Sequence, residues 1–367
     1  MPRILITGGA GFIGSHAALH FARHGWDVRV LDNLSRGQLL HKVDPNARHN
    51  WDRLGSEAQV GAEVPIPGSL PLEQKPIERI LGDIRDRDTV NEAVRDVDVV
   101  LHAAAQTAVT TSTVDPATDF ETNALGTFRV LNAIRESGRK PAFLYCSTNK
   151  VYGERVNAVP LEERESRWTF AGPHARGIPE EFGVDLCEHT PYGCSKLTGD
   201  LYVQDFGHLY GLKVGVFRMS CIYGTQQFGL EDQGWVAWFV IAALRGAPLT
   251  IFGDGKQVRD VLWVDDLVRA YEAFIERGPQ VGVFNMGGGS EFTLSLRELL
   301  AQLEARLGRK IPVAQAGWRP SDQKVYVSNI DHARSTLGWR PEVSPKQGVD
   351  RLFDWVEQNP SLFAHIG

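Results

Sequence analysis

The chain has 367 residues, 43% of them hydrophobic and 23% charged, which is typical of a globular protein with one large or two unequal domains. Its net charge of −6 excludes the basic surface of a nucleic-acid-binding protein, so an anionic ligand must be met by locally placed arginines. No apolar run approaches the roughly 20 residues of a membrane span, and no signal peptide precedes the first strand. We therefore expect a cytoplasmic protein without nucleic-acid or membrane partners. Four cysteines without a CxxC pair also favour a reducing compartment: Cys146, Cys187, Cys194 and Cys221.

Apolar strands and helical patterns alternate through the first half of the chain. A strand at 3–7 enters a glycine loop, a helical pattern at 15–25 ends on a glycine, and a second strand follows at 27–32. The alternation continues with an apolar run at 77–83, a helix at 85–96, a strand at 97–105, a helix at 117–138, and strands at 141–147 and 213–220. This order predicts an α/β protein: a Rossmann-type doubly wound parallel sheet, with a smaller mixed α/β C-terminal substrate domain.

The glycine loop has the spacing of a dinucleotide site. Gly8, Gly11 and Gly14 form GxxGxxG between a strand and a helix, which permits a tight turn and close approach of a pyrophosphate to the helix N-terminus. Asp32 ends the second strand and can accept hydrogen bonds from both hydroxyls of the adenosine ribose. Arg36 is a counter-signal, because a nearby arginine can hold the extra phosphate of NADP. Asp32 comes first and is better placed, so the pattern favours NAD.

We predict an NAD-binding domain over 1–220, to which 259–288 returns, and a substrate-binding region over 221–367. Within the first domain, residues 36–76 break the alternation with five prolines and little periodicity. We interpret this segment as an insertion near the adenosine end of the cofactor; a solvated loop without a role is equally compatible with its composition. Leucines at helical spacing predict a helix at 294–308.

Tyr192 and Lys196 are four residues apart in PYGCSK, so on a helix they share one face. An ammonium favours the phenolate of a neighbouring tyrosine, which can then act as a base near neutral pH. The strand that ends at Ser147 and Thr148 should deliver hydroxyls to the carboxyl edge of the sheet, where open α/β sheets bind ligands. These residues predict hydride chemistry on an alcohol.

The chain resembles the extended short-chain dehydrogenases/reductases, in particular their nucleotide-sugar epimerase/dehydratase group. The motifs that carry the resemblance span nearly the whole chain in the order of that family: GGAGFIG (8–14), GDIRD (82–86), HAAAQ (102–106), STNKVYG (147–153), PYGCSK (191–196), FRMSCIYG (217–224), GKQVRDVLWVDD (255–266) and RPSDQ (319–323). More narrowly, several runs resemble enzymes that epimerise CDP-linked sugars at C2, the CDP-paratose to CDP-tyvelose conversion.

The resemblance implies a role for each matching residue. Tyr192 would be the active-site base, Lys196 would bind the nicotinamide ribose and lower the pKa of the tyrosine, and Thr148 would hydrogen-bond the reacting sugar oxygen. Arg259 and Arg319 would meet the substrate diphosphate, which suits recognition by guanidinium groups. The other implied cofactor ligands are Gly8, Gly11, Phe12, Ile13, Gly14, Asp32, Asn33, Ser35, Arg36, Asp83, Ile84, Ala103, Ala104, Ala105 and Asn123; the other implied substrate contacts are Gln106, Ser147, Asn149 and Asp322.

The two residues after Thr148 discriminate between the chemistries of this group. Sugar 4,6-dehydratases of the family carry an Asp–Glu pair there, because removing water needs an acid and a base. This chain has Asn149 and Lys150, which disfavours dehydration and leaves epimerisation through a transient 2-keto sugar. The C2 position and the cytidine base rest on the resemblance alone, and the residues themselves serve equally well in a 4-epimerase of UDP- or GDP-hexoses. A third alternative is a non-catalytic NAD-sensing protein, although such proteins usually lack the tyrosine.

The expected ligands are tightly bound NAD⁺ and a small-molecule nucleotide-diphospho-sugar, and no metal site is expected. His189 precedes the catalytic helix, where we expect it to pack rather than to touch the sugar. Pairing of the helices at 117–138 and 192–211 between subunits, as in related enzymes, predicts a homodimer or homotetramer.

Overall fold

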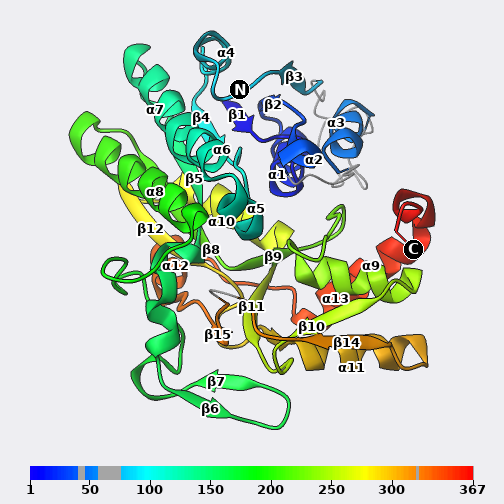
Figure 1. Ribbon diagram of the computed structural model, residues 1–367. Helices are drawn as coiled ribbons and strands as arrows, with labels where there is room; N and C mark the ends of the chain where they lie inside the picture. Colours follow the sequence, from blue (N-terminus) through cyan, green and yellow to red (C-terminus); the bar gives the residue numbers. More distant parts are fainter. Residues whose placement is uncertain (40–45, 57–75, 320–321, 367) are drawn as a thin grey trace, which may run out of the picture. The chain divides into compact units, whose positions relative to one another are not determined.

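The computed structural model describes residues 1–39, 46–56, 76–319 and 322–366. These residues form two compact units, coloured along the chain in Figure 1. Unit 1 consists of 1–147, 194–217 and 268–283, and unit 2 consists of 148–193, 218–267 and 284–367. The limits differ from the predicted boundary at residue 220, because 148–193 pack within unit 2. The late segment of unit 1 is 268–283, and the predicted return of 259–288 to the NAD-binding domain stays a prediction. The functional assignment of the two regions stays a prediction.

Unit 1 is built around a seven-stranded sheet with the strand order β12-β8-β5-β4-β1-β2-β3. Strand β1 lies between β2 and β4, and the pairs β1–β2, β1–β4, β2–β3 and β4–β5 are all parallel. The direction of strand order therefore reverses at β1 and β4, which is where sheets of this kind bind ligands beyond their carboxyl ends. The predicted doubly wound sheet is confirmed. Its strands are β1 (Arg3–Thr7), β2 (Asp27–Asp32), β3 (Glu78–Leu81), β4 (Val99–His102), β5 (Ala142–Thr148), β8 (Val214–Met219) and β12 (Val281–Met286).

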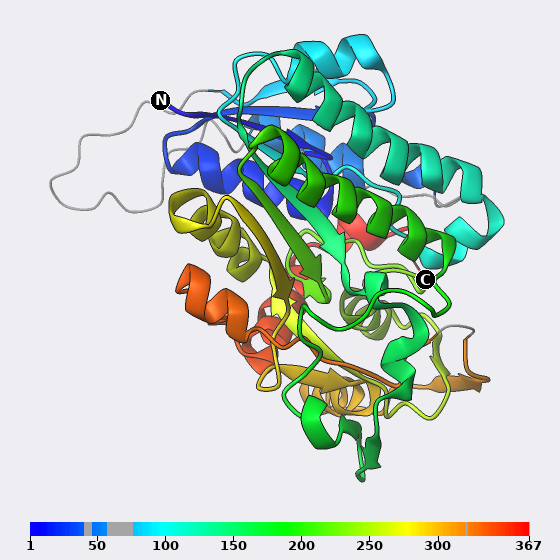
Figure 2. The ribbon, with the colours of Figure 1, turned by 90° about the vertical axis from the view of Figure 1, so that its left-hand side faces the viewer.

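Helices cover both faces of this sheet, as Figure 2 shows. On one face, α4 (Arg87–Ala93), α7 (Gly126–Glu136) and α8 (Pro191–Tyr210) bury apolar side chains against β1, β4, β5 and β8. The other face carries α1 (Phe12–Arg23), α3 (Asn46–Ser56) and α10 (Val264–Arg277); α1 contacts α3 directly. Burial on both faces is why the central strands β1, β4, β5 and β8 are almost continuously apolar in sequence.

The predicted helix at 117–138 is divided into three parts. Helix α6 (Pro116–Phe120) begins after Asp115, whose carboxylate accepts the backbone N–H of Thr118, and it runs through a π-helical turn (Glu121–Leu125) into α7. The short helix α5 (Val109–Val114) precedes them. A π-helical turn widens the helix and commonly accompanies a functional residue. Here the turn contains Asn123, one of the predicted site residues.

The prediction of an irregular insertion over 36–76 is partly wrong. Helices α2 (Arg36–Leu39) and α3 occupy part of this segment, and α3 packs on α1. Its periodicity was missed because α3 is polar, with Leu54 as a fully buried side chain among residues such as Arg48 and Asp52. Residues 40–45 and 57–75 of the insertion lie outside the described residues.

Unit 2 is built on small sheets and on helices α9, α11 and α13, whose apolar faces form one hydrophobic core. Strand β11 pairs with β9 and β15 in parallel and with β13 in antiparallel fashion, β10 pairs with β14, and β6 forms a hairpin with β7. The strands are β6 (Leu161–Glu163), β7 (Trp168–Phe170), β9 (Cys221–Tyr223), β10 (Leu249–Phe252), β11 (Val258–Trp263), β13 (Thr293–Ser295), β14 (Val313–Ala316) and β15 (Val325–Tyr326). The helices are α9 (Trp235–Arg245), α11 (Leu296–Leu307), α12 (Asp331–Leu337) and α13 (Pro345–Gln358), with 3₁₀ segments at Asn149–Ala158, Gly172–His174 and Pro360–Phe363.

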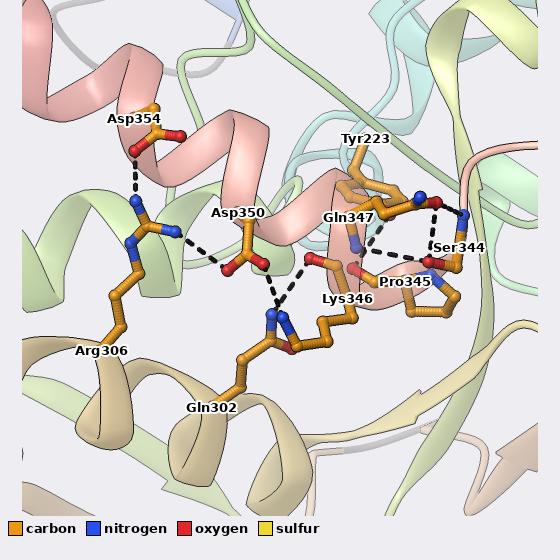
Figure 3. Close-up of polar contacts among 9 residues, drawn as sticks. All are labelled: Tyr223, Gln302, Arg306, Ser344, Pro345, Lys346, Gln347, Asp350 and Asp354. Carbon is orange, nitrogen blue, oxygen red and sulfur yellow. Dashed lines mark hydrogen bonds and ion pairs between the residues drawn. The ribbon is translucent and has the colours of Figure 1, made fainter.

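Helix α11 confirms the helix predicted at 294–308. Ser295 and Glu298 form a reciprocal capping box at its start, and Gly308 ends it in a left-handed conformation. Figure 3 shows how α11 meets α13: Arg306 pairs with Asp350 (3.0 Å) and Asp354. Ser344 caps α13 in the same reciprocal way with Gln347. Both helices therefore begin where local sequence signals place them, and ion pairs join them in addition to the hydrophobic core that they share.

Candidate active site

The glycine loop of unit 1 packs too closely on other backbone for a side chain to fit. Gly8 has φ +70°, and a Cβ there would lie 2.6 Å from the backbone nitrogen of Ala104. At Gly14 a Cβ would lie 2.1 Å from the carbonyl oxygen of Gly8. Gly11 precedes the first turn of α1, which contains Phe12, Ile13 and no acidic residue. The backbone N–H groups of this turn thus form an uncompensated positive helix end suited to a phosphate.

Asp32 stands at the end of β2 and organises the same loop. Its carboxylate accepts the backbone N–H groups of Ala10 (2.9 Å) and Leu34 (2.8 Å). Burial raises the pKa of Asp32, while these two hydrogen bonds oppose the shift. Each oxygen retains a second lone pair, so the side chain can still accept from a ribose hydroxyl. The position of Asp32 beside the glycine loop therefore suits the adenosine ribose of NAD.

Next to Asp32, a polar group joins the ends of β2 and β3. Asn33 donates to Asp83 (2.8 Å), and Ser35 donates to the side-chain oxygen of Asn33. Although burial raises the pKa of Asp83, hydrogen bonds from Arg85 and Asn33 outweigh it and lower that pKa. Beside this group, Ile84 is buried against α7, and Arg36 lies half-buried at the start of α2.

Beyond β4, the chain segment 103–106 is held by a buried amide network. Asn123 accepts the backbone N–H of Gln106 (2.8 Å) and donates to its carbonyl (3.0 Å), which fixes the course of Ala103–Ala105 next to β1. Asn123 also donates to Asp119 and to Ser195 of α8 (3.1 Å each). The side chain of Gln106 bonds to Ala108 and Asp119, so in this structure it supports the loop instead of pointing out of it.

Lys196 is buried in unit 1, with 3% of its surface exposed. Its ammonium lies 4.2 Å from the centre of the Tyr145 ring, and burial lowers its pKa to about 8 against the opposing charges of Cys146, Asp200 and Asp119. Ser147 donates to Asp200 (2.7 Å). The lysine is therefore still mostly protonated at neutral pH, in an environment of low polarity where its charge acts strongly.

The remaining predicted residues of the reacting centre belong to unit 2. Thr148 ends β5, and its hydroxyl accepts the backbone N–H of Lys150 (3.3 Å) and donates to Asn149 (3.4 Å). Tyr192 lies in the first turn of α8 with 9% of its surface exposed. His189 contacts the carbonyls of Val151 (2.9 Å) and Cys187 (3.1 Å) through both ring nitrogens, as expected of a packing residue.

A group of basic side chains follows Thr148 within unit 2. Burial, and next the positive charge of Arg259, lowers the pKa of Lys150 to about 8, while Asp322 opposes this shift. Arg259 pairs with Asp322 at 2.8 Å. Arg319 pairs with Asp232 at 3.4 Å, and its guanidinium lies 3.8 Å from the centre of the Phe252 ring. Each predicted phosphate-binding arginine therefore has a carboxylate partner that orients it. A diphosphate that bound to the arginine would compete with this carboxylate for the guanidinium group.

Sequence reasoning missed the buried carboxylates that surround the lysine. Asp200 follows Lys196 by one helical turn, a spacing that could have revealed it. Asp119 precedes Asn123 by the same spacing, but no local pattern indicates that it lies near Lys196, because α6 and α8 are far apart in the sequence.

Fold and residues together define a protein of the NAD dependent epimerase/dehydratase family, and the chain belongs to that family over residues 4–287. It is 36% identical to CDP-paratose 2-epimerase of Salmonella typhi, covering 96% of this chain and 99% of that protein. It is 29% identical to a putative UDP-glucose 4-epimerase of Methanocaldococcus jannaschii, over 97% and 99% of the two chains. Among solved structures, UDP-glucose 4-epimerase of Thermus thermophilus in complex with NAD superposes with a TM-score of 0.75 at 30% identity, over 97% of this chain and 99% of the other.

The match to the family model confirms the predicted family and the predicted use of NAD. Among the described residues, no helix combines the length and apolar character that crossing a membrane requires.

Proposed function

We propose that the protein epimerises a nucleotide-diphospho-sugar at C2, in a reaction of the CDP-paratose to CDP-tyvelose type, with tightly bound NAD⁺. The observation that carries this proposal is the sequence after β5: Thr148 is followed by Asn149, which cannot usefully exchange a proton, and by Lys150, which places a positive charge where a dehydratase has a carboxylate. The buried ammonium of Lys150 has a depressed pKa and a positive neighbour in Arg259, an environment unlike that of an acid–base carboxylate pair. The likeness to CDP-paratose 2-epimerase supports the choice of C2 and of cytidine.

Side chains of the protein orient the sugar and transfer the proton of its reacting hydroxyl. Thr148 holds the reacting sugar hydroxyl by a hydrogen bond, and the Tyr192 phenolate takes the proton of that hydroxyl and later returns it. Lys196, one turn further along the same helix, favours the phenolate by its charge and binds the nicotinamide ribose. When bound, NAD supplies the hydride acceptor and donor for the transient oxidation of the sugar carbon. Between the two transfers the keto sugar turns, so that it presents its other face.

Around this centre, the glycine loop with Asp32 binds the dinucleotide, Asp83 and Ile84 line its adenine pocket, and Ala103–Ala105 border it. Arg259 and Arg319 hold the substrate diphosphate, with Asp322 orienting the first of them. Gln106 and Ser147 support the site indirectly. Gln106 fixes the loop after β4 through Ala108 and Asp119, and Ser147 fixes the end of β5 through its hydrogen bond to Asp200.

The test is incubation of the purified protein with CDP-paratose, CDP-glucose, GDP-glucose and UDP-glucose, followed by separation of the product sugars. Inversion of CDP-paratose at C2 without added cofactor is the expected result. Conversion of UDP-glucose or GDP-glucose at C4 instead would establish the second candidate, a 4-epimerase, which the relatives and solved neighbours of that kind support. Loss of deuterium from C2-labelled substrate to solvent would contradict direct hydride return.

Two variants separate catalysis from cofactor binding. Tyr192→Phe should lower turnover by about 10² to 10⁴ and leave the NAD released on denaturation unchanged. Turnover at the parental rate in this variant would point to the non-catalytic NAD-sensing alternative. Lys196→Met should lower both turnover and bound NAD.

We also propose that the active protein is a cytoplasmic homodimer or homotetramer formed through α7 and α8. Apolar side chains that are 42–67% exposed on α8 support this: Leu201, Tyr202, Leu209 and Tyr210. Light scattering after size exclusion tests it, and a monomer at micromolar concentration would contradict it.

A further inference from the structure

Two helices on one face of the sheet in unit 1 bring together three side chains that the reaction does not use. His20 and His24 are one helical turn apart on α1, and Glu272 faces them from α10. Each side chain offers one ligand atom, and the three atoms lie within 4.8 Å of one another. From this geometry we infer that His20, His24 and Glu272 form a binding site for a divalent transition-metal ion, with Zn²⁺ as the best-fitting ion.

The distances are close to those of a formed site. Ligand atoms at about 2.0–2.1 Å from a tetrahedral Zn²⁺ are about 3.3 Å apart. The Nε2 atom of His20 and the Oε2 atom of Glu272 already lie 3.3 Å apart, at present as a hydrogen-bonded or ionic pair. The metal would take the place of the proton between them. The ligand atom of His24 lies within 4.8 Å of these two atoms, so a small side-chain adjustment completes the set.

His24 is oriented as a metal ligand is. Its Nδ1–H donates to the backbone carbonyl of His20 (2.7 Å), which places the ring proton on Nδ1 and directs Nε2 outward as the lone-pair donor. A backbone carbonyl behind the distal nitrogen is the usual support for a ligating imidazole. The two imidazole rings lie 4.2 Å apart at 31°, so they can turn toward one ion. Two histidines at i and i+4 are a common chelating pair on a helix.

The electrostatic setting also favours a cation. His24 caps the C-terminus of α1, where the helix dipole places partial negative charge. Glu272 adds a full negative charge, and its side chain and that of His20 are only 30% and 21% exposed. Two imidazoles and one carboxylate, with a fourth position open to water, make up a ligand set that Zn²⁺ uses in proteins. An ion bound here would join α1, the helix behind the glycine loop, to α10.

The sequence alone does not predict a metal site here. HxxxH is visible in SHAALHFARHG, but Glu272 is 252 residues from His20 and only the packing of α10 brings it near. Among the described residues, this is the group of three potential ligands that meets the distance requirement.

The experiment is a titration of the full-length protein, carrying its own nucleotide, with Zn²⁺ against a chromophoric chelator. Binding of Co²⁺ followed by its visible absorption reports the coordination geometry. The wild-type protein should bind one Zn²⁺ per chain with micromolar affinity, and Zn²⁺ should raise its Tm. His24→Gln and Glu272→Gln should each weaken binding by at least about tenfold and abolish the shift in Tm.

Two matched controls separate this site from surface chelation. Glu276→Gln changes the carboxylate one turn further along α10, and His208→Gln changes an exposed histidine at the end of α8. Both should bind Zn²⁺ like the wild type. Affinity that is unchanged in His24→Gln and Glu272→Gln, or reduced equally in the controls, would overturn the inference, as would the absence of Zn²⁺ binding to the wild type.

Discussion

Replacement of Gly14 by alanine tests the packing of the glycine loop. A Cβ at this position would lie 2.1 Å from the carbonyl oxygen of Gly8 and 2.9 Å from the Cα of Gly9, both of them backbone atoms. Since a comfortable carbon–oxygen contact is about 3.3 Å, the turn must move by about 1 Å. Alanine in a helix gains about 1 kcal/mol over glycine, whereas overpacking a close contact costs about 1–3 kcal/mol. Because these neighbours are backbone atoms of Gly8 and Gly9, which cannot turn aside as a side chain can, the cost of the clash exceeds the gain in helix propensity. We expect the upper end of this cost, and therefore a net loss of about 2 kcal/mol in the free energy of unfolding.

Gly11→Ala is the informative comparison. A Cβ there would meet a single neighbour, the carbonyl oxygen of Gly8 at 3.0 Å, so stability should fall by less than about 1 kcal/mol. The added methyl group would instead stand where a pyrophosphate approaches the helix, and bound NAD should fall. Gly317→Ala, with no heavy atom within 4 Å of its Cβ, serves as the control.

Urea unfolding of nucleotide-depleted protein measures the stability, and release on denaturation measures the NAD. Gly14→Ala should lose stability in the depleted state, and Gly11→Ala should lose NAD while remaining stable. The packing argument is refuted if Gly14→Ala is as stable as the wild type, or if Gly11→Ala is the less stable of the two.

Three further outcomes follow from the charged groups. Since the pKa of Lys196 is about 8, kcat/KM should fall as the pH rises through 8 and the ammonium is lost; a flat profile to pH 10 would contradict this role. Asp260 accepts backbone N–H groups from Gly289 and Ser328, and burial raises its pKa from 3.8 to about 6, so its contribution favours folding below about pH 4 and is lost as the pH rises through 6. Asp260→Asn should therefore exceed the wild type in unfolding free energy by about 1–3 kcal/mol at pH 8, with the difference vanishing near pH 4 in urea titrations. Arg306→Ala removes the ion pairs of Figure 3 and should cost about 1 kcal/mol at low salt and less in 1 M NaCl, since such exposed pairs are screened; equal losses at both salt concentrations would point to packing instead.

The site that could be predicted consists of residues whose signals are local. GGAGFIG lies between a strand and a helix, and Tyr192 and Lys196 do lie on one helix, four residues apart. The resemblance implies that Gln106 contacts the sugar, but in the structure its side chain donates hydrogen bonds to Ala108 and Asp119. These two partners could not be predicted from the sequence. The helix α3 was missed because its polar sequence gives a weak periodic signal, although it packs on α1.

By itself, the sequence determined six of the seven strands of the parallel sheet, all except β12, together with the dinucleotide loop and the tyrosine–lysine pair, since each follows from spacing within a few residues. Only the tertiary structure decided that Asp119 lies near Lys196, that Asp322 holds Arg259, and that Glu272 meets His20. These contacts join residues from separate parts of the chain. No local pattern encodes them, because they depend on which strands and helices pack against one another in the folded chain.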